Sequence, residues 1–343
     1  MKVNRDMAEQ KKSSFARQLS FHIEGRVLIL AVVLIILVIF FGTIRSRFLT
    51  TNSIKSMAFQ CPEIGLMGLG MAIAMMINGI NLSINDTANV SALVAGLSLI
   101  ELAPLFVGHE FISIAIAFLV AVIMGVACGS LNGFLVGYVG APPILVTLAT
   151  LTLYRGISVV ITGGQTLTGF PDELSVIGHQ AVLGIPVPFV IFLLTGIVVY
   201  FILEHTTFGF KVRMLGTNPT AAKFSGIDTK SITMKVYILS GILGAIAGII
   251  VMSRTNSVAY EYGTRTYILQ ALLISVLGGI SPGFGSVIGV LLATFILQVI
   301  STGFNMLLLG VQGSSFFKDF SWGVIFIVIL IIDRLVHRHS GMG

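Results

Sequence analysis

Repeated apolar runs of roughly 15 to 25 residues dominate this chain, and that is the length of α-helix that crosses about 30 Å of hydrocarbon. Hydrophobic residues make up 55% of the 343 positions and charged residues only 10%, a balance that indicates a membrane protein. We therefore expect an all-α polytopic membrane protein with about ten transmembrane helices. The expected spans are centred on 27–42, 60–78, 87–106, 111–138, 144–162, 188–203, 232–252, 267–280, 285–304 and 322–335; the eighth is short, and the third contains Glu101 and Pro104.

The distribution of Lys and Arg predicts the orientation, because basic residues near span ends stay on the cytoplasmic side. About twice as many fall in the N-terminal segment, the stretch 204–231 and the C-terminal tail as in the loops on the other side, and the loop 163–186 has none. The predicted topology thus explains the net charge of +6, and no nucleic-acid partner is needed to account for it. We expect a cytoplasmic N-terminal segment (1–26), a transmembrane domain (27–336) carrying the cytoplasmic loop 204–231, and a cytoplasmic tail (337–343).

The first apolar run is expected to remain as a membrane anchor. A charged segment of 26 residues precedes it, and no small-residue cleavage site follows it in the sequence.

Glycines at helical spacing predict close packing between spans, because lipid gives apolar helices no hydrophobic drive to associate. One stripe and two pairs have the spacing that lets backbones approach. They are Gly125, Gly129, Gly133 and Gly137; Gly244 and Gly248; and Gly285 and Gly289.

Ionisable residues within the spans are scarce, which disfavours an ion-coupled carrier. Only Glu101 and Arg155 are interpreted as deep in the membrane. The six histidines are scattered and form no pattern of metal ligands or acid–base pairs, which disfavours an enzyme. Cys61 and Cys128 lie in apolar stretches and are expected to be buried free thiols.

A polar, basic segment lies between two apolar spans at residues 209–227, and it predicts a short amphipathic helix at the membrane surface. On charge alone, a loop that is basic only because it lies on the cytoplasmic side is an equally good interpretation. The pattern, however, resembles the coupling segment in permease subunits of bacterial ABC importers for sugars, the ribose-type family of the branched-chain permease superfamily. The matching residues are Gly209, Arg213, Gly216, Asn218, Ala221, Ala222, Ser225 and Gly226.

Three further stretches resemble the same family in the same order. Residues 78–84 are similar to its Gly-Gly-Ile-Asp-Leu-Ser-Val motif, residues 141–150 to its Pro-Pro-Phe-Ile-Val-Thr-Leu stretch, and residues 277–289 to its late glycine-rich turn. The chain departs from the pattern at Asn81, where the family has Asp, at Ile84 and Asn85 in place of Val-Gly, and at Pro282. A pentose, a hexose and a sugar-like signal such as autoinducer-2 therefore all stay open as the solute.

The resemblance implies a type II ABC importer-like fold and a permease subunit in the bacterial cytoplasmic (inner) membrane. It also implies ABC ATPase subunits docked at residues 209–227, an extracytoplasmic solute-binding protein, and a second permease subunit in a homo- or heterodimer. No Gly-x-x-x-x-Gly-Lys-Ser/Thr sequence occurs, so we expect this chain to bind no cofactor and the partner ATPase to use the ATP. The alternatives are an ABC permease for branched-chain amino acids or nucleosides, and a stand-alone secondary carrier.

Polar residues that interrupt apolar spans are the candidates for the solute path, because a sugar needs hydrogen-bond partners within the membrane. One group gathers between the second and third spans, and a second follows in the fifth. For Ser83, Asn85 and Asp86 helix capping is an alternative role, and for the second group an alternative is bonding to backbone carbonyls within the helix. The candidates are Asn78, Asn81, Ser83, Asn85, Asp86 and Asn89, and then Thr147, Thr150 and Arg155.

Overall fold

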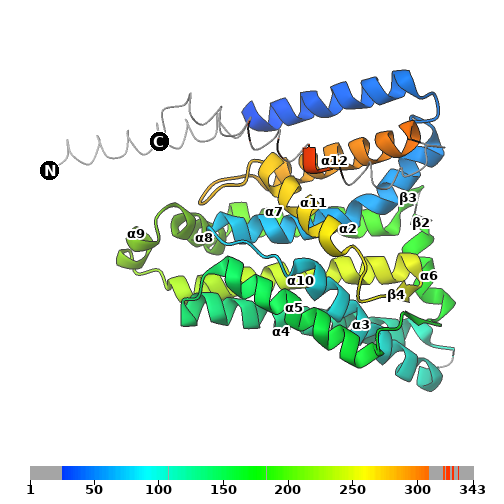
Figure 1. Cartoon of the computed structure of the whole chain (residues 1–343), viewed down its shortest axis with the longest axis horizontal. Coiled ribbons are helices and arrows are strands. Elements are labelled where there is room, and N and C mark those ends of the chain that lie inside the picture. The colour runs from blue at the N-terminus through cyan, green and yellow to red at the C-terminus, as the bar shows by residue number, and fades with distance from the viewer. Residues whose placement is uncertain are drawn as a thin grey trace.

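Long helices build most of the protein, as the computed structural model shows (Figure 1). The structure describes residues 25–106, 108–182 and 184–308, together with 320, 322–324, 327 and 331. Within these residues, eight helices are long and apolar enough to span a membrane. They are Gly25–Ile44, α2 (Thr51–Met76), α3 (Ile84–Leu102, extended by the 3-10 turn Ala103–Phe106), α4 (Glu110–Phe134, extended by the π-helical turn Leu135–Val139), α5 (Pro143–Thr162), α7 (Val187–His205), α10 (Thr229–Thr255) and α12 (Val287–Leu307).

Two of the ten expected spans differ from these eight. The expected eighth span is the apolar helix α11 (Thr264–Leu277), which has only 14 residues. The expected tenth span, 322–335, lies largely outside the described residues, as do most of the N-terminal segment 1–26 and the tail 337–343.

The short elements mark the two ends of the bundle (Figure 1). At one end, which we call the α9 end, lie α8 (Thr207–Thr217) and α9 (Pro219–Phe224). At the other, the sheet end, lie α6 (Asp172–His179) and four two-residue strands: β1 (Leu167–Thr168), β2 (Ala181–Val182), β3 (Ile185–Pro186) and β4 (Ser257–Val258). Strand β1 pairs antiparallel with β4, and β2 pairs antiparallel with β3.

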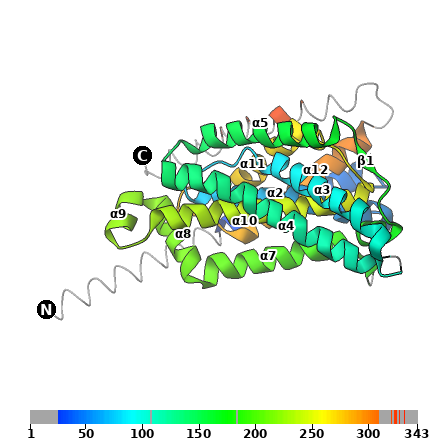
Figure 2. The ribbon, with the colours of Figure 1, turned by 90° about the horizontal axis from the view of Figure 1, so that it is seen from below.

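Helices α2 and α10 form the enclosed centre of the bundle, and the others surround them. Figure 2 shows α5 and α7 on opposite sides of this centre. The main hydrophobic core is formed by α2 with α7, α10, α11 and α12, whereas Gly25–Ile44 exposes most of its apolar side chains, as a helix in contact with lipid does.

The glycine stripe on α4 packs directly against the backbone of α10, as its spacing predicted. A Cβ added at Gly125 would meet the carbonyl oxygen of Gly241, and one at Gly129 would meet that of Tyr237. Gly133 and Gly137 continue the contact toward the start of α10, so the two helices touch along their length through backbone atoms. The two cysteines, Cys61 and Cys128, are buried and free, as expected.

Helix α3 begins beside the middle of α10 rather than at an end of the bundle. Gly244 and Gly248 of α10 lie against the carbonyl oxygens of Ile84 and Ala88, so the contact advances by four residues on both helices and they run parallel. Gly244 is about 22 Å of helix beyond the start of α10. The non-helical segment 77–83 therefore runs from the end of α2 into the bundle, where α3 begins.

Candidate functional site

The basic segment expected to be one amphipathic helix forms two helices, α8 and α9, with Asn218 between them. Asn218 accepts a hydrogen bond from the backbone N–H of Ala221 (2.9 Å) and so caps α9. Thr206 caps α8 in the same way through Gly209 (3.4 Å). Each cap supplies an acceptor for an N–H group that a helix start leaves unpaired, which explains why two short helices form here.

Several residues of the expected coupling set serve the internal structure of this end. Gly209 lies against the backbone of Leu203, and Gly216 lies against the carbonyl of Met76 and the backbone of Gly283, so neither position has room for a Cβ. Ala222 is fully buried. Arg213 forms an ion pair with Glu204 of α7 (2.5 Å), which fixes α8 to that helix.

The longest exposed part of the segment is the α9 tip, which we define as residues 217–221 and 223–226; Phe210 and Lys211 of α8 are exposed as well. Of the expected coupling set, it carries Asn218, Ala221, Ser225 and Gly226. It also carries Phe224, whose side chain is 88% exposed. Phe224 was not predicted as part of this surface, although an aromatic residue beside Lys223 in a polar loop was a usable signal.

Five polar residues of four segments form a continuous buried hydrogen-bond chain. Thr150 donates to Asn132 (2.7 Å), Asn132 donates to Ser83 (2.8 Å), Ser83 donates to Asn81 (2.9 Å), and Asn81 donates to Ser240 (2.9 Å). This chain joins α5, α4, the break before α3, and α10. Asn132 and Ser240, which the sequence analysis did not single out, complete it, and Ser83 lies at the N-cap position without forming a capping bond.

The next residues of α3 fix two other parts of the molecule. Asp86 accepts hydrogen bonds from Arg155 of α5, 3.0 Å from Nε and 3.4 Å from Nη2. Asn85 and Asn89 donate to backbone carbonyls in the segment 259–263, which connects β4 to α11. The first two turns of α3 therefore bind both α5 and this connecting segment.

A second buried ion pair contradicts the expectation that only Glu101 and Arg155 are deep. Glu63, in the middle of α2, is 1% exposed and pairs with Arg254 of α10. The hydroxyl of Tyr267 donates to the same carboxylate (2.7 Å), and that of Tyr262 lies 3.4 Å from it. Glu101 is instead exposed near the end of α3.

The remaining expected path residues lie at the edges of the polar region. Asn78 is exposed in the turn after α2, with a left-handed backbone (φ 61°). Thr147 is buried and donates both to the carbonyl of Ile80 (3.0 Å) and to that of Pro143 (2.9 Å), so it combines a contact between segments with the expected bond to its own helix.

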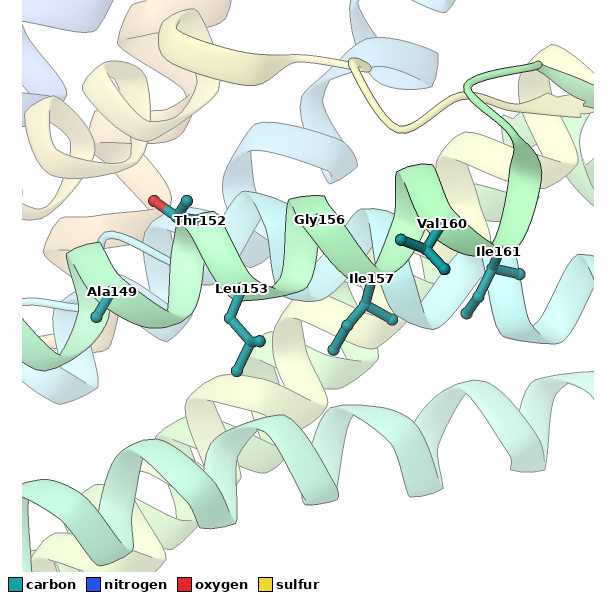
Figure 3. Close-up of a pocket in the computed structure, with 7 residues that line it drawn as sticks. All are labelled: Ala149, Thr152, Leu153, Gly156, Ile157, Val160 and Ile161. Atoms are coloured by element: carbon teal, nitrogen blue, oxygen red, sulfur yellow. The ribbon is translucent and has the colours of Figure 1, made fainter.

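The outer face of α5 is hollowed into a shallow apolar depression of about 490 Å³ (Figure 3). Its lining residues all come from this helix: Ala149, Thr152, Leu153, Gly156, Ile157, Val160 and Ile161. Among the described residues, no three His, Cys, Asp or Glu side chains gather closely enough to hold a metal ion.

An apolar helical bundle, broken by buried polar contacts and capped at one end by a basic helical loop, is the architecture of a polytopic membrane protein. Residues 53–332 match the family described as the branched-chain amino acid transport system / permease component, and the chain belongs to this family.

Curated relatives resemble the chain over nearly its whole length. The D-allose transport system permease protein of Escherichia coli (strain K12) is 29% identical, over 98% of both chains. The ribose import permease protein of Bacillus subtilis (strain 168) is 32% identical, over 88% of this chain and 90% of the relative. The autoinducer 2 import system permease protein of Enterobacter sp. (strain 638) is 28% identical, over 90% of this chain and 93% of the relative.

A solved structure supports the fold. A metal-chelate type ABC transporter in an inward-facing conformation has a TM-score of 0.53 at 14% sequence identity, covering 89% of this chain and 98% of that one. By its family and its curated relatives, the chain is the permease subunit of an ABC importer, a multi-pass protein of the inner membrane and not an enzyme. A permease of this class works with ATPase subunits and a solute-binding protein.

Proposed function

We propose that this chain forms the translocation path for a sugar or a sugar-like solute. The observation that carries the proposal is its similarity to relatives named for D-allose, ribose and autoinducer 2, over 88% or more of the chain. The buried network of Asn, Ser and Thr side chains around the start of α3 supports it, because such a network makes one region of an otherwise apolar bundle polar, as a path for a polyhydroxylated solute requires.

The proposed path has its polar wall at the start of α3 and its neighbours. Asn81, Ser83 and Thr150 are buried in the hydrogen-bond chain, so their proposed role is to hold this wall in place. Direct contact with the solute is proposed for groups that are at least partly exposed, such as Asn78 and Arg155.

The α9 tip is proposed as the docking surface for the ATPase. It combines a cation at Lys223, an exposed aromatic ring at Phe224 and the small residue Ala221, which suits a groove on a partner protein. The partner ATPase would bind and hydrolyse the ATP, and this chain would bind no cofactor. The assembly would also contain a second permease subunit, identical or paralogous.

Uptake of defined sugars tests this function. Cells that depend on a plasmid copy of this permease, within its complete importer, should accumulate radiolabelled D-ribose or D-allose only while ATP is available. A proton ionophore applied at constant ATP should leave the initial rate unchanged. Accumulation of neither sugar would contradict the proposed solute class, and uptake that collapses with the ion gradient at constant ATP would contradict ATP-driven transport.

A further inference from the structure

A partly exposed polar group lies on the surface of the bundle beside the first turns of α3. Its three members are Arg155 of α5 and the consecutive residues Tyr260 and Glu261 of the segment 259–263. The Arg155 side chain is 34% exposed although its partner Asp86 is only 1% exposed. Glu261 is exposed, and one of its carboxylate oxygens accepts a hydrogen bond from the Tyr260 hydroxyl (2.7 Å).

Helix α3 brings these residues to one place. Asp86 binds Arg155, and Asn89, less than one turn later, donates to the carbonyls of Tyr260 (3.2 Å) and Tyr262 (2.9 Å). Two anchors on adjacent turns thus hold α5 and the connecting segment side by side.

The polar group lies away from the sheet end, toward the middle of the bundle. Gly96 of α3 packs against Phe170, two residues beyond β1, and this contact marks the level of the β1–β4 pair. Asn89 lies seven residues nearer the start of α3, which is about 10 Å of helix. The segment that follows β4 therefore runs back into the bundle, and α11 begins there.

A carboxylate and a guanidinium at this depth are unfavourable against lipid, so this part of the surface does not face lipid. In a permease, the translocation path supplies a polar environment at this depth. On the basis of the proposed function, we propose that Glu261, Tyr260 and Arg155 form a binding site for the hydroxyl groups of the passing solute.

The chemistry of the group suits neighbouring hydroxyls on a sugar. The Glu261 carboxylate can accept further hydrogen bonds besides the one from Tyr260. The Arg155 guanidinium can donate further ones, because its two bonds to Asp86 use only Nε and Nη2. An acceptor on the connecting segment and a donor on α5 can bind two hydroxyls of one sugar, one hydroxyl donating and the other accepting. Asp86 then acts as a positioning residue, because its fork to Arg155 fixes the plane of the guanidinium.

Discrimination between a sugar and its singly deoxygenated analogues tests the site. The readout is the ratio of maximal uptake rates for D-ribose over each deoxy-D-ribose, measured with the complete importer. The solute-binding protein is the same in every comparison, so its own preference cancels between variant and wild type. For at least one hydroxyl, Glu261→Gln is expected to reduce this ratio about tenfold, because a hydrogen bond to a charged group is lost.

Two variants complete the experiment. Tyr260→Phe removes only the hydroxyl bonded to Glu261 and should reduce the same ratio by a smaller factor. Glu101→Gln makes the same chemical change at an exposed carboxylate outside the group, and it should leave every ratio unchanged.

Each outcome is decisive. If Glu261→Gln and Tyr260→Phe slow the uptake of all analogues by one common factor, or leave all rates unchanged, the binding site is overturned while the proposed function stands. If the wild type takes up neither D-ribose nor D-allose, the proposed function fails, and the binding site fails with it.

Discussion

The buried carboxylates are the residues on which the polar interior depends. Asp86 and Glu63 are each 1% exposed, and each has an arginine partner on a different helix. A buried pair is a weak source of net stability, but loss of one partner leaves an uncompensated charge. When only one member of such a pair is buried, removal of the exposed partner therefore costs more stability than removal of the buried one.

This inequality gives a prediction for the Asp86–Arg155 pair. Arg155→Met strands a buried carboxylate and should lower the free energy of unfolding in detergent by about 1–3 kcal/mol. Asp86→Asn should cost less, because the guanidinium is 34% exposed and can be hydrated. Denaturant titration followed by tryptophan fluorescence measures both changes, and the double variant should recover part of the Arg155→Met loss. Equal losses for the two single variants, with no recovery, would show that the pair is not the cause.

Sequence reasoning located Asp86 and Arg155 but could not pair them, and it missed Glu63. A single carboxylate in an apolar run gives no sign of its partner when that partner follows 191 residues later (Glu63 and Arg254). Arg254 lies at the end of a span, where its charge reads as a topology signal. Which charged residues pair depends on tertiary contacts. The spacing of glycines is a property of one helix, so it could be recognised in the sequence.

At the scale of elements, the contact between α4 and α10 depends on the absence of side chains. Gly129→Ala would place a methyl group against the Tyr237 carbonyl, so it should destabilise the chain by about 1–3 kcal/mol. Gly156→Ala on α5 is the matched control, because its Cβ would meet nothing within 4 Å. Thermal unfolding in detergent should show a lower midpoint for the first variant and an unchanged or slightly higher one for the second. A large loss from Gly156→Ala would contradict this packing.

The α9 tip yields a prediction from two adjacent alanines, one exposed and one buried. Ala221→Glu adds an exposed carboxylate at the third position of α9, where acceptors favour the helix, so the chain should fold normally while ATPase binding weakens. Phe224→Ala should weaken binding at least fivefold, because an exposed aromatic anchor is lost.

Ala222→Glu is the contrasting variant, since it buries a charge and should disrupt α9 itself. Co-purification of the ATPase, combined with limited proteolysis of this loop, separates the two effects. Normal co-purification of the ATPase with Ala221→Glu and with Phe224→Ala would count against docking at the tip.

At the scale of the whole molecule, the structure distinguishes two ends, and the charge pattern predicts which is cytoplasmic. In a background with Cys61 and Cys128 replaced by Ala, Thr220→Cys lies at the α9 end and Gln165→Cys at the sheet end, and both positions are exposed. A membrane-impermeant maleimide should label Gln165→Cys from outside and Thr220→Cys only after the membrane is opened. The reverse pattern would contradict the predicted orientation.

Hydropathy was sufficient to predict the class of fold, but not how two of its helices begin. Spans such as α4 and α12 appeared in the sequence because one apolar run corresponds to one helix. The starts of α3 and α11 inside the bundle were not predictable in this way, since a chain that turns back at membrane depth has the same composition as one that turns at the surface. Their position is defined by specific contacts, such as those of Asn85 and Asn89 with the segment 259–263.

The contact at Gly216 has a mechanical consequence. Its α-carbon lies against the Met76 carbonyl, which also accepts a hydrogen bond from the Gly283 N–H (2.8 Å). Three distant segments thus meet through main-chain atoms, with no rotatable side chain between them to yield under load. A displacement of α8 should therefore also displace the end of α2 and the turn before α12. This junction connects the α9 tip rigidly to the centre of the bundle.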